Sequence, residues 1–181
     1  MSDPAYRSQF SRHVALIGEE GLRRLRSAVV AVIGAGGLGS TVLELLARSG
    51  VGTIRIFDAA SVDLPDLNRQ ILYTHDDLGT LKAEAAAARL SRINPALAAE
   101  PHVVRVEASV DFAGSDVVVD CLDNFETRFV VDEATYEPGI PLVHGGVYQY
   151  FGQVTTIHRE HTMSLREIFG EAATAQAEEP A

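Results

Sequence analysis

The chain has 181 residues, of which 46% are apolar and 22% charged, a composition that predicts one folded domain and excludes a wholly disordered protein. With 25 acidic and 15 basic residues the formal net charge is −10, which argues against general nucleic-acid binding because phosphates repel such a surface. One cysteine cannot form an internal disulfide or a four-cysteine zinc site, so we expect a cytoplasmic protein without structural zinc. The apolar runs are broken well short of a membrane span, so no membrane association is expected.

The pattern along the chain predicts a helical arm followed by alternating strands and helices. Residues 1–27 are locally basic, and their sparse apolar periodicity is typical of one or two short amphipathic helices. Beyond the arm, we expect strands at 28–33, 53–57, 101–107, 116–121, 141–145 and 149–157, and helices at 38–49, 78–93 and 124–137. The last strand is a candidate for antiparallel pairing.

This order of elements predicts an α/β fold with a Rossmann-like, doubly wound, mostly parallel sheet. Residues 28–157 would form a nucleotide-binding α/β domain, with ligands beyond the carboxyl ends of the strands. Residues 158–181 would form a C-terminal segment. After Glu171 the composition offers little to bury, so we expect part of that segment to be disordered.

A glycine-rich loop lies between the first predicted strand and the helix that follows it. It contains Gly34, Gly36, Gly37 and Gly39, and this context favours phosphate binding. Gly34 would permit the tight turn, Gly36 would let the backbone approach a phosphate, and Gly39 would let the helix pack against the strand. The helix N-terminus adds free amides and a partial positive charge. The alternative is a turn that serves packing alone.

Asp58 ends the second predicted strand, where an acid normally accepts hydrogen bonds from ribose hydroxyls. The alternative is that Asp58 only holds backbone amides of the adjoining loop. The glycine loop and this acid together fit NAD and ATP equally well.

The connection from Ala59 to Gly79 is about twenty residues long, and such long connections are usually functional or disordered. It carries Asp66 and Arg69, and Lys82 follows in the first turn of the next predicted helix. The helix dipole disfavours a cation there, so a negative group is expected to compensate Lys82. Arg69 and Lys82 are the residue types that grip a triphosphate, whereas a dinucleotide site needs neither. Their alternative is exposure on the surface.

The fourth predicted strand ends in Asp120-Cys121-Leu122-Asp123-Asn124, at the point where the strand order reverses. Asp123 is a candidate ligand for Mg²⁺, which prefers one or two carboxylates together with phosphate oxygens. The alternative is that Asp123 or Asn124 caps the following helix.

Three further groups are weaker candidates. Cys121 lies in an apolar strand, so a buried neutral thiol is expected rather than a nucleophile. His144 ends a buried strand and is expected to be a hydrogen-bonded structural histidine. His158, Glu160 and His161 offer metal ligands, but their spacing is weak support for a metal site.

In combination these motifs resemble the ThiF/MoeB/HesA family, bacterial relatives of ubiquitin-activating enzymes. The resemblance spans residue 6 to about residue 157 and rests on GAGGLGS, Asp58, Asp66-Leu67-Asn68-Arg69-Gln70, Lys82, Arg92-Ile93-Asn94-Pro95 and 120–124. It implies an adenylyltransferase that uses ATP and Mg²⁺ to convert the C-terminal carboxylate of a ubiquitin-like sulfur carrier, ending in Gly-Gly, into an acyl-adenylate.

The resemblance also implies roles for individual residues. Arg12 matches the arginine that in this family reaches the phosphates from the other protomer, which implies a homodimer; its alternative is a solvated side chain on the arm. Carried over by motif, the nucleotide would contact Gly34, Gly36, Gly37, Gly39, Asp66 and Leu122, the ribose Asp58, the phosphates Arg69 and Lys82, and magnesium Asp123.

The sequence departs from the family pattern at several places. Ala60 stands where many members have a second acid, and Asp66 where they have asparagine, which adds a negative charge near the triphosphate. The two zinc-binding CxxC pairs are absent, and the chain is C-terminally short. Two alternative functions therefore remain: a truncated, catalytically silent module that binds a nucleotide or a partner, and an NAD-dependent oxidoreductase.

Overall fold

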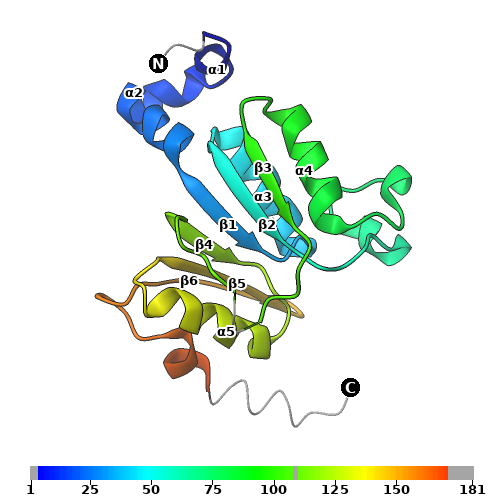
Figure 1. Cartoon of the computed structure of the whole chain (residues 1–181), viewed down its shortest axis with the longest axis vertical. Helices are drawn as coiled ribbons and strands as arrows, with labels where there is room; N and C mark the ends of the chain where they lie inside the picture. Colours follow the sequence, from blue (N-terminus) through cyan, green and yellow to red (C-terminus); the bar gives the residue numbers. More distant parts are fainter. Residues whose placement is uncertain (1–3, 108–109, 171–181) are drawn as a thin grey trace.

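A six-stranded sheet forms the centre of the computed structural model, which describes residues 4–107 and 110–170 (Figure 1). Its strand order is β3-β2-β1-β4-β5-β6. The strands are β1 (Val29–Ile33), β2 (Thr53–Phe57), β3 (Ala98–His102), β4 (Val117–Asp120), β5 (Leu142–Tyr148) and β6 (Phe151–Ile157). β1 to β5 pair in parallel and β6 pairs antiparallel with β5. The Rossmann-like, mostly parallel sheet is thereby confirmed, and its strand order reverses between β1 and β4.

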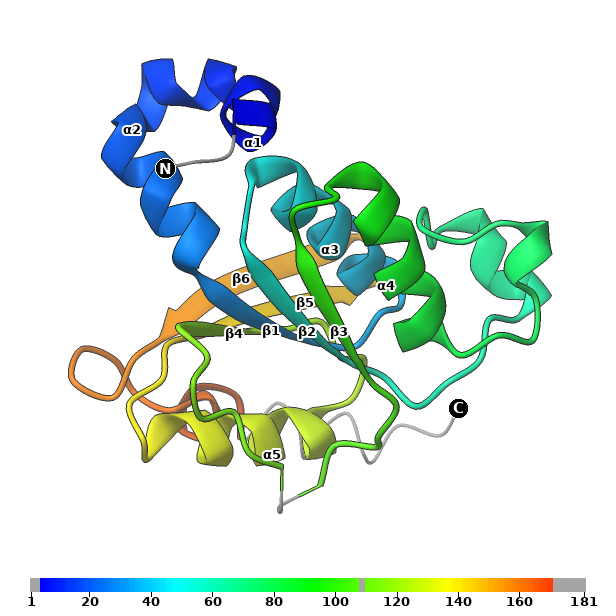
Figure 2. The same ribbon diagram turned by 45° about the horizontal axis from the view of Figure 1, so that its top comes forward.

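Helices cover both faces of the sheet, with α3 and α4 on one side and α5 on the other (Figure 2). The helices are α1 (Pro4–Gln9), α2 (Ser11–Ser27), α3 (Gly37–Ser49), α4 (Lys82–Ile93) and α5 (Phe125–Tyr136), with 3₁₀ turns η1 (Leu64–Asn68) and η2 (His75–Asp77). On β1, Val30 and Val32 belong to the apolar cluster of α3 and α4, whereas Ala31 and Ile33 belong to the opposite cluster. Burial on both faces explains why β1 is continuously apolar.

The N-terminal arm docks on the end of α3 that is remote from the glycine loop. Tyr6 and Phe10 pack with Leu22, and the Tyr6 hydroxyl donates to the carbonyl of Gly50, which caps the C-terminus of α3. Gly18 kinks α2 at a φ of 71°. The arm is therefore held at the amino ends of the strands.

Two predicted boundaries differ most from the structure. The strand predicted at 101–107 is observed as β3, Ala98–His102. It ends at His102 because that residue pairs with Phe57, the last residue of β2, and residues 103–107 leave the sheet. The helix predicted from residue 78 begins at Lys82, because Gly79 has a φ of 80° and Leu81 pairs with Ser61 in an isolated bridge. Both differences shape the same cavity.

Residues 158–170 extend the fold beyond β6. The carboxylate of Asp132 in α5 accepts the N–H groups of Leu165, at 2.9 Å, and Arg166, at 3.1 Å, and so fixes the helical turn at 165–170. The expectation of disorder after Glu171 falls on residues outside those described. In the described part of the chain, none of the helices combines the length and apolar character needed to cross a bilayer.

Candidate active site

A cavity of about 840 Å³ opens at the carboxyl ends of the central strands. Its walls are the glycine loop, the segments that follow β2 and β3, and the turn after β4. Residues 104–106, which the sequence assigns to a strand, form part of the wall. The cavity thus lies at the reversal of strand order, where the doubly wound fold places its ligands.

The glycine loop has the geometry that its sequence predicts. Gly34 has a φ of 91°, and a side chain there would meet the carbonyl oxygen of Cys121 at 3.0 Å. A Cβ at Gly39 would collide with the carbonyl of Gly34, so only glycine lets α3 start this close to β1. Gly36 caps α3 without a side-chain hydrogen bond. The first amides of α3 are therefore available to an anion at the cavity wall.

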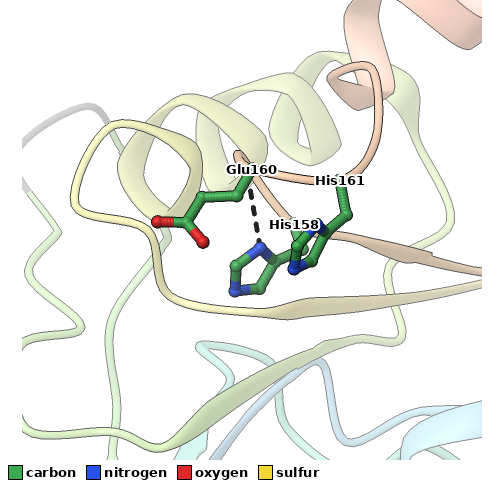
Figure 3. Close-up of side chains that lie close together, drawn as sticks. All are labelled: His158, Glu160 and His161. Carbon is green, nitrogen blue, oxygen red and sulfur yellow. Dashed lines mark hydrogen bonds between the residues drawn. The ribbon is translucent and has the colours of Figure 1, made fainter.

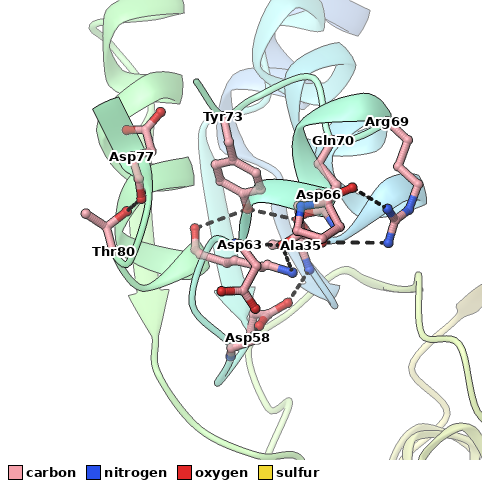
Figure 4. Close-up of polar contacts among 12 residues, drawn as sticks. Ala35, Asp58, Asp63, Asp66, Arg69, Gln70, Tyr73, Asp77 and Thr80 are labelled. Atoms are coloured by element: carbon pink, nitrogen blue, oxygen red, sulfur yellow. Dashed lines mark hydrogen bonds and ion pairs between the residues drawn. The ribbon is translucent and has the colours of Figure 1, made fainter. Parts of the chain in front are cut away.

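Asp58 follows β2 and supports this loop directly. Its Oδ2 accepts the N–H of Ala35 at 2.7 Å, and its Oδ1 accepts the N–H of Ala60 at 2.7 Å (Figure 4). The contacts with loop amides, which were the alternative to a ribose contact, are thus present. Each carboxylate oxygen can accept a second hydrogen bond, and the half-buried side chain lines the cavity, so a ribose contact is compatible with this role.

Asp66 is the centre of a buried polar network on the opposite wall. Its Oδ2 lies 2.9 Å from Nζ of Lys82 and accepts the N–H of Asp63 at 3.0 Å, while its Oδ1 accepts from Nε2 of Gln70 at 2.7 Å. Arg69 lies 3.6 Å away and is largely exposed. Burial acts to raise the pKa of Asp66, but the Asp63 N–H and the Lys82 ammonium outweigh it, so that pKa lies below its ordinary value. The negative group expected near Lys82 is Asp66.

Two residues of this wall were not among the predicted site residues. The Tyr73 hydroxyl donates to the carbonyl of Ala35 at 2.8 Å and so ties the long connection to the glycine loop (Figure 4). Gln70 lines the cavity, and its buried Oε1 has no hydrogen-bond partner in residues 4–107 and 110–170. An aromatic residue in a long connection carries no signal of such a role, whereas Gln70 was visible in the motif around Arg69.

The turn after β4 resolves the capping question. Asn124 caps α5, because its Oδ1 accepts the N–H of Thr127 at 2.9 Å. Asp123 is exposed and lines the cavity with Leu122. Within residues 4–107 and 110–170, the one hydrogen bond of its side chain is accepted by Oδ1 from Nδ2 of Asn124, at 3.2 Å. The Asp123 carboxylate is therefore free to meet a cation beside the phosphates, and its oxygen donors suit Mg²⁺.

Arg12 does not line this cavity. It is exposed on α2, in the arm that docks at the C-terminal end of α3, whereas the cavity lies at the N-terminal end. The 13 residues of α3 make these two ends about 20 Å apart. Arg12 thus lies remote from the site formed by its own chain.

Cys121 lines the cavity, and a cluster of buried polar side chains lies next to it around Asp120. Burial and the neighbouring charge of Asp120 raise the pKa of the Cys121 thiol to about 12, which agrees with an inert buried sulfur. His144 is fully buried, and its Nδ1 lies 2.6 Å from Oδ2 of Asp120. Arg128 lies 3.6 Å from the same carboxylate and donates to the carbonyl of Leu122.

His158, Glu160 and His161 gather in the turn after β6 (Figure 3). One potential ligand atom of each lies within 4.8 Å of the others, the imidazoles stack at 4.9 Å, and His158 Nδ1 accepts the N–H of Glu160 at 3.4 Å. Glu160 and His161 are exposed. This open cluster differs from a closed tetrahedral zinc site, so the expectation of no structural zinc stays a prediction.

Fold and cavity together define a Rossmann-like α/β domain with a glycine-loop site at its switch point. The chain belongs to the ThiF family, which it matches over residues 10–180. The expected family membership is thereby confirmed.

Two curated relatives are close in sequence. The "SAMP-activating enzyme E1" of Haloferax volcanii is 44% identical over 160 residues, which cover 86% of this chain and 59% of the relative. The "Sulfur carrier protein adenylyltransferase" of Thermus thermophilus is 43% identical over 145 residues, 78% of this chain and 54% of the relative. The chain therefore spans little more than half the length of these proteins.

Among solved structures, the fold is similar to E. coli tRNA N6-threonylcarbamoyladenosine dehydratase, TcdA, in complex with ATP. The TM-score is 0.77 at 30% identity, over 82% of this chain and 65% of the other.

Proposed function

We propose that this protein is an ATP- and Mg²⁺-dependent adenylyltransferase that activates the C-terminal carboxylate of a ubiquitin-like sulfur carrier ending in Gly-Gly. The observation that carries the proposal is the meeting of Lys82, Arg69 and Asp123 with the glycine loop around one cavity. The names of the two relatives and the ATP complex of the similar solved structure support it.

In the proposed reaction, a carboxylate oxygen of the carrier attacks the α-phosphorus of ATP in line. The bond between the α-phosphorus and the oxygen bridging to the β-phosphorus breaks, and pyrophosphate leaves with that electron pair. No general base is required, since the carboxylate is already ionised at neutral pH. The protein contributes position and positive charge: loop amides and Lys82 hold phosphates, Arg69 offers a bidentate fork, and Asp58 orients the ribose.

Asp123 is the residue that would hold Mg²⁺. Magnesium supplies neutralisation of the triphosphate charge when it is bound. This matters here because Asp66 places an additional carboxylate on the cavity wall. The ammonium of Lys82 already pairs with the carboxylate of Asp66 at 2.9 Å. The net positive charge available to a triphosphate is therefore smaller than the number of cationic side chains in the site.

We further propose a homodimer in which Arg12 acts on the nucleotide bound by its partner. The support is its distance from its own cavity along α3 and the match of its motif to the family. A two-fold interface would make both sites equivalent. The free thiol of Cys121 suits the cytoplasm, where we place the protein.

Calorimetry that compares Mg²⁺-ATP with NAD tests the nucleotide assignment. We expect ATP to bind, with affinity reduced when Mg²⁺ is replaced by a chelator, and NAD not to bind. Binding of NAD without ATP would favour the oxidoreductase. Binding of ATP without any chemistry on a carrier would favour the silent module.

A further inference from the structure

A line of hydrogen bonds leads from the buried centre of the sheet to its edge. His144 Nδ1 lies 2.6 Å from Oδ2 of Asp120, and His144 Nε2 lies 3.1 Å from Nε2 of Gln153 on β6. Asp120 and His144 are fully buried, and Gln153 is half-buried. The line thus joins β4, the strand that precedes Asp123, to the edge of the sheet.

The Asp120 carboxylate sets the direction of the first bond. An ionised carboxylate only accepts, so the Nδ1 of His144 donates to Asp120, which also faces the guanidinium of Arg128 at 3.6 Å. With the ring proton on Nδ1, Nε2 is the acceptor for the amide nitrogen of Gln153, 3.1 Å away. Gln153 Oε1 then has no hydrogen-bond partner among the residues described.

Gln153 borders a second, smaller cavity of about 180 Å³. Asp123 and Val147 line both cavities, so the smaller one adjoins the proposed magnesium ligand. Gly146 and Gly152 form part of its wall, and a Cβ at Gly146 would meet Gln153 Nε2 at 3.0 Å. Glycine at 146 therefore lets the Gln153 side chain lie across β5 and reach His144.

We propose that His144 is a positioning residue that turns the amide of Gln153 so that its Oε1 accepts the last peptide N–H of the acceptor. This inference rests on the proposed function. The smaller cavity shares Asp123 with the nucleotide cavity, so an acceptor whose carboxylate meets the α-phosphate near Asp123 would lie beside Gln153. The recognised class is thus a peptide, which carries an N–H next to its terminal carboxylate, and not a simple carboxylic acid; the glycine ending comes from the proposed function.

Kinetics with a carrier ending in Gly-Gly test the contact. Gln153→Leu keeps the approximate size but removes the amide, and should raise the carrier KM about tenfold, as expected for one lost hydrogen bond, with the ATP KM unchanged. Thr156→Ala, an exposed change on the same strand, is the matched control. Equal effects on both KM values, or none, would overturn the inference.

A modified carrier identifies the bonded group. Replacing the terminal glycine of the carrier by N-methylglycine removes the peptide N–H. This change should raise the carrier KM of the wild-type protein about tenfold. It should not raise the carrier KM of Gln153→Leu any further, because that variant has already lost the hydrogen bond. Additive losses would mean that Gln153 does not meet this N–H, which overturns the inference while the proposed function stands. Pyrophosphate exchange with no carrier at all would overturn both.

The orientation is also testable without turnover. In ¹⁵N spectra of the whole unliganded protein, the Nδ1 of His144 should carry a proton and its Nε2 should not, and Gln153→Leu should shift the resonance of Nε2. A proton on Nε2 would require Gln153 to present its oxygen to His144, which contradicts the proposal. His144→Phe is the less informative variant because it also removes the group that lies 2.6 Å from Oδ2 of the fully buried Asp120.

Discussion

The ammonium of Lys82 lies 2.9 Å from Oδ2 of Asp66, and both side chains are only 11% exposed. Lys82 is the first residue of α4, where the helix dipole disfavours a cation, and Asp66 offsets that cost. The same carboxylate accepts from Gln70, so the network orders the wall that faces the glycine loop. Asp66 thus holds Lys82, the lysine that we propose binds phosphate, and also adds a negative charge to the proposed ATP site.

Asp66→Asn should tighten binding of Mg²⁺-ATP. The substitution removes a negative charge beside the triphosphate and releases the full charge of Lys82, which we expect to lower the Kd roughly three- to tenfold at low salt. Calorimetry at two salt concentrations measures this. Asp63→Asn removes the same charge from a neighbouring residue that does not line the cavity, and is the control. Weaker binding by the Asp66 variant would show that the orientation of Lys82 matters more than its charge.

The same variant should lose stability in a pH-dependent way. The folded-state pKa of Asp66 lies below its ordinary value of 3.8, so the ionised group stabilises the fold above that pH, and this contribution disappears as pH falls through the folded-state pKa. Asp66→Asn should therefore lower the free energy of unfolding by about 1.5–3 kcal/mol at pH 7 and by less below pH 4. Denaturant titrations across this range measure the difference. If the loss of unfolding free energy does not depend on pH, it arises from packing and not from the charge of Asp66.

Substitutions of Lys82 and of Arg69 should differ in their effect on stability but not in their effect on catalysis. Each change to alanine should cost about 2–4 kcal/mol of transition-state stabilisation, the scale of one preorganised donor. Lys82→Ala also strands the buried Asp66 carboxylate and should lower Tm, whereas Arg69 is largely exposed and should leave Tm unchanged. Combining Lys82→Ala with Asp66→Asn should restore Tm but not the rate. Unchanged rates in the two alanine variants would mean that neither cation takes part in the reaction.

Much of the fold follows from the sequence, because continuous apolar strands and amphipathic helices depend on local pattern. β1 and β2 lie where their β-branched runs predict. The segment 103–107 has the same apolar character, yet it leaves the sheet because β2 is too short to pair with it. Strand ends set by a neighbour's length are not encoded in the strand itself.

The sequence identifies most of the residues that line the cavity, but not the contacts between them. The cation positions Arg69 and Lys82 and the turn around Asp123 were visible as motifs. The pairing of Lys82 with Asp66 depends on how the connection between β2 and α4 folds back, with Tyr73 tied to Ala35. The same holds for Gln153 and His144, which meet only through the pairing of β5 with β6.

Mixed dimers test the role of Arg12. Arg12→Ala and Asp123→Ala should each be inactive, because every site in either homodimer lacks one required group. In a mixed dimer, the site that retains Asp123 receives Arg12 from its partner, and the other site lacks both. With random subunit exchange, activity should recover to about a quarter of wild type, since half of the dimers contain one complete site. No recovery despite demonstrated exchange would mean that Arg12 does not act across the dimer.

Exchange of labelled pyrophosphate into ATP tests the central claim most directly, because it requires reversible formation of an acyl-adenylate. With a ubiquitin-like carrier ending in Gly-Gly, we expect exchange that requires Mg²⁺, disappears in Asp123→Ala, and is absent with the same carrier lacking its last two residues. Binding of ATP without exchange, for every sulfur carrier supplied, would contradict the adenylyltransferase and leave a nucleotide-binding module.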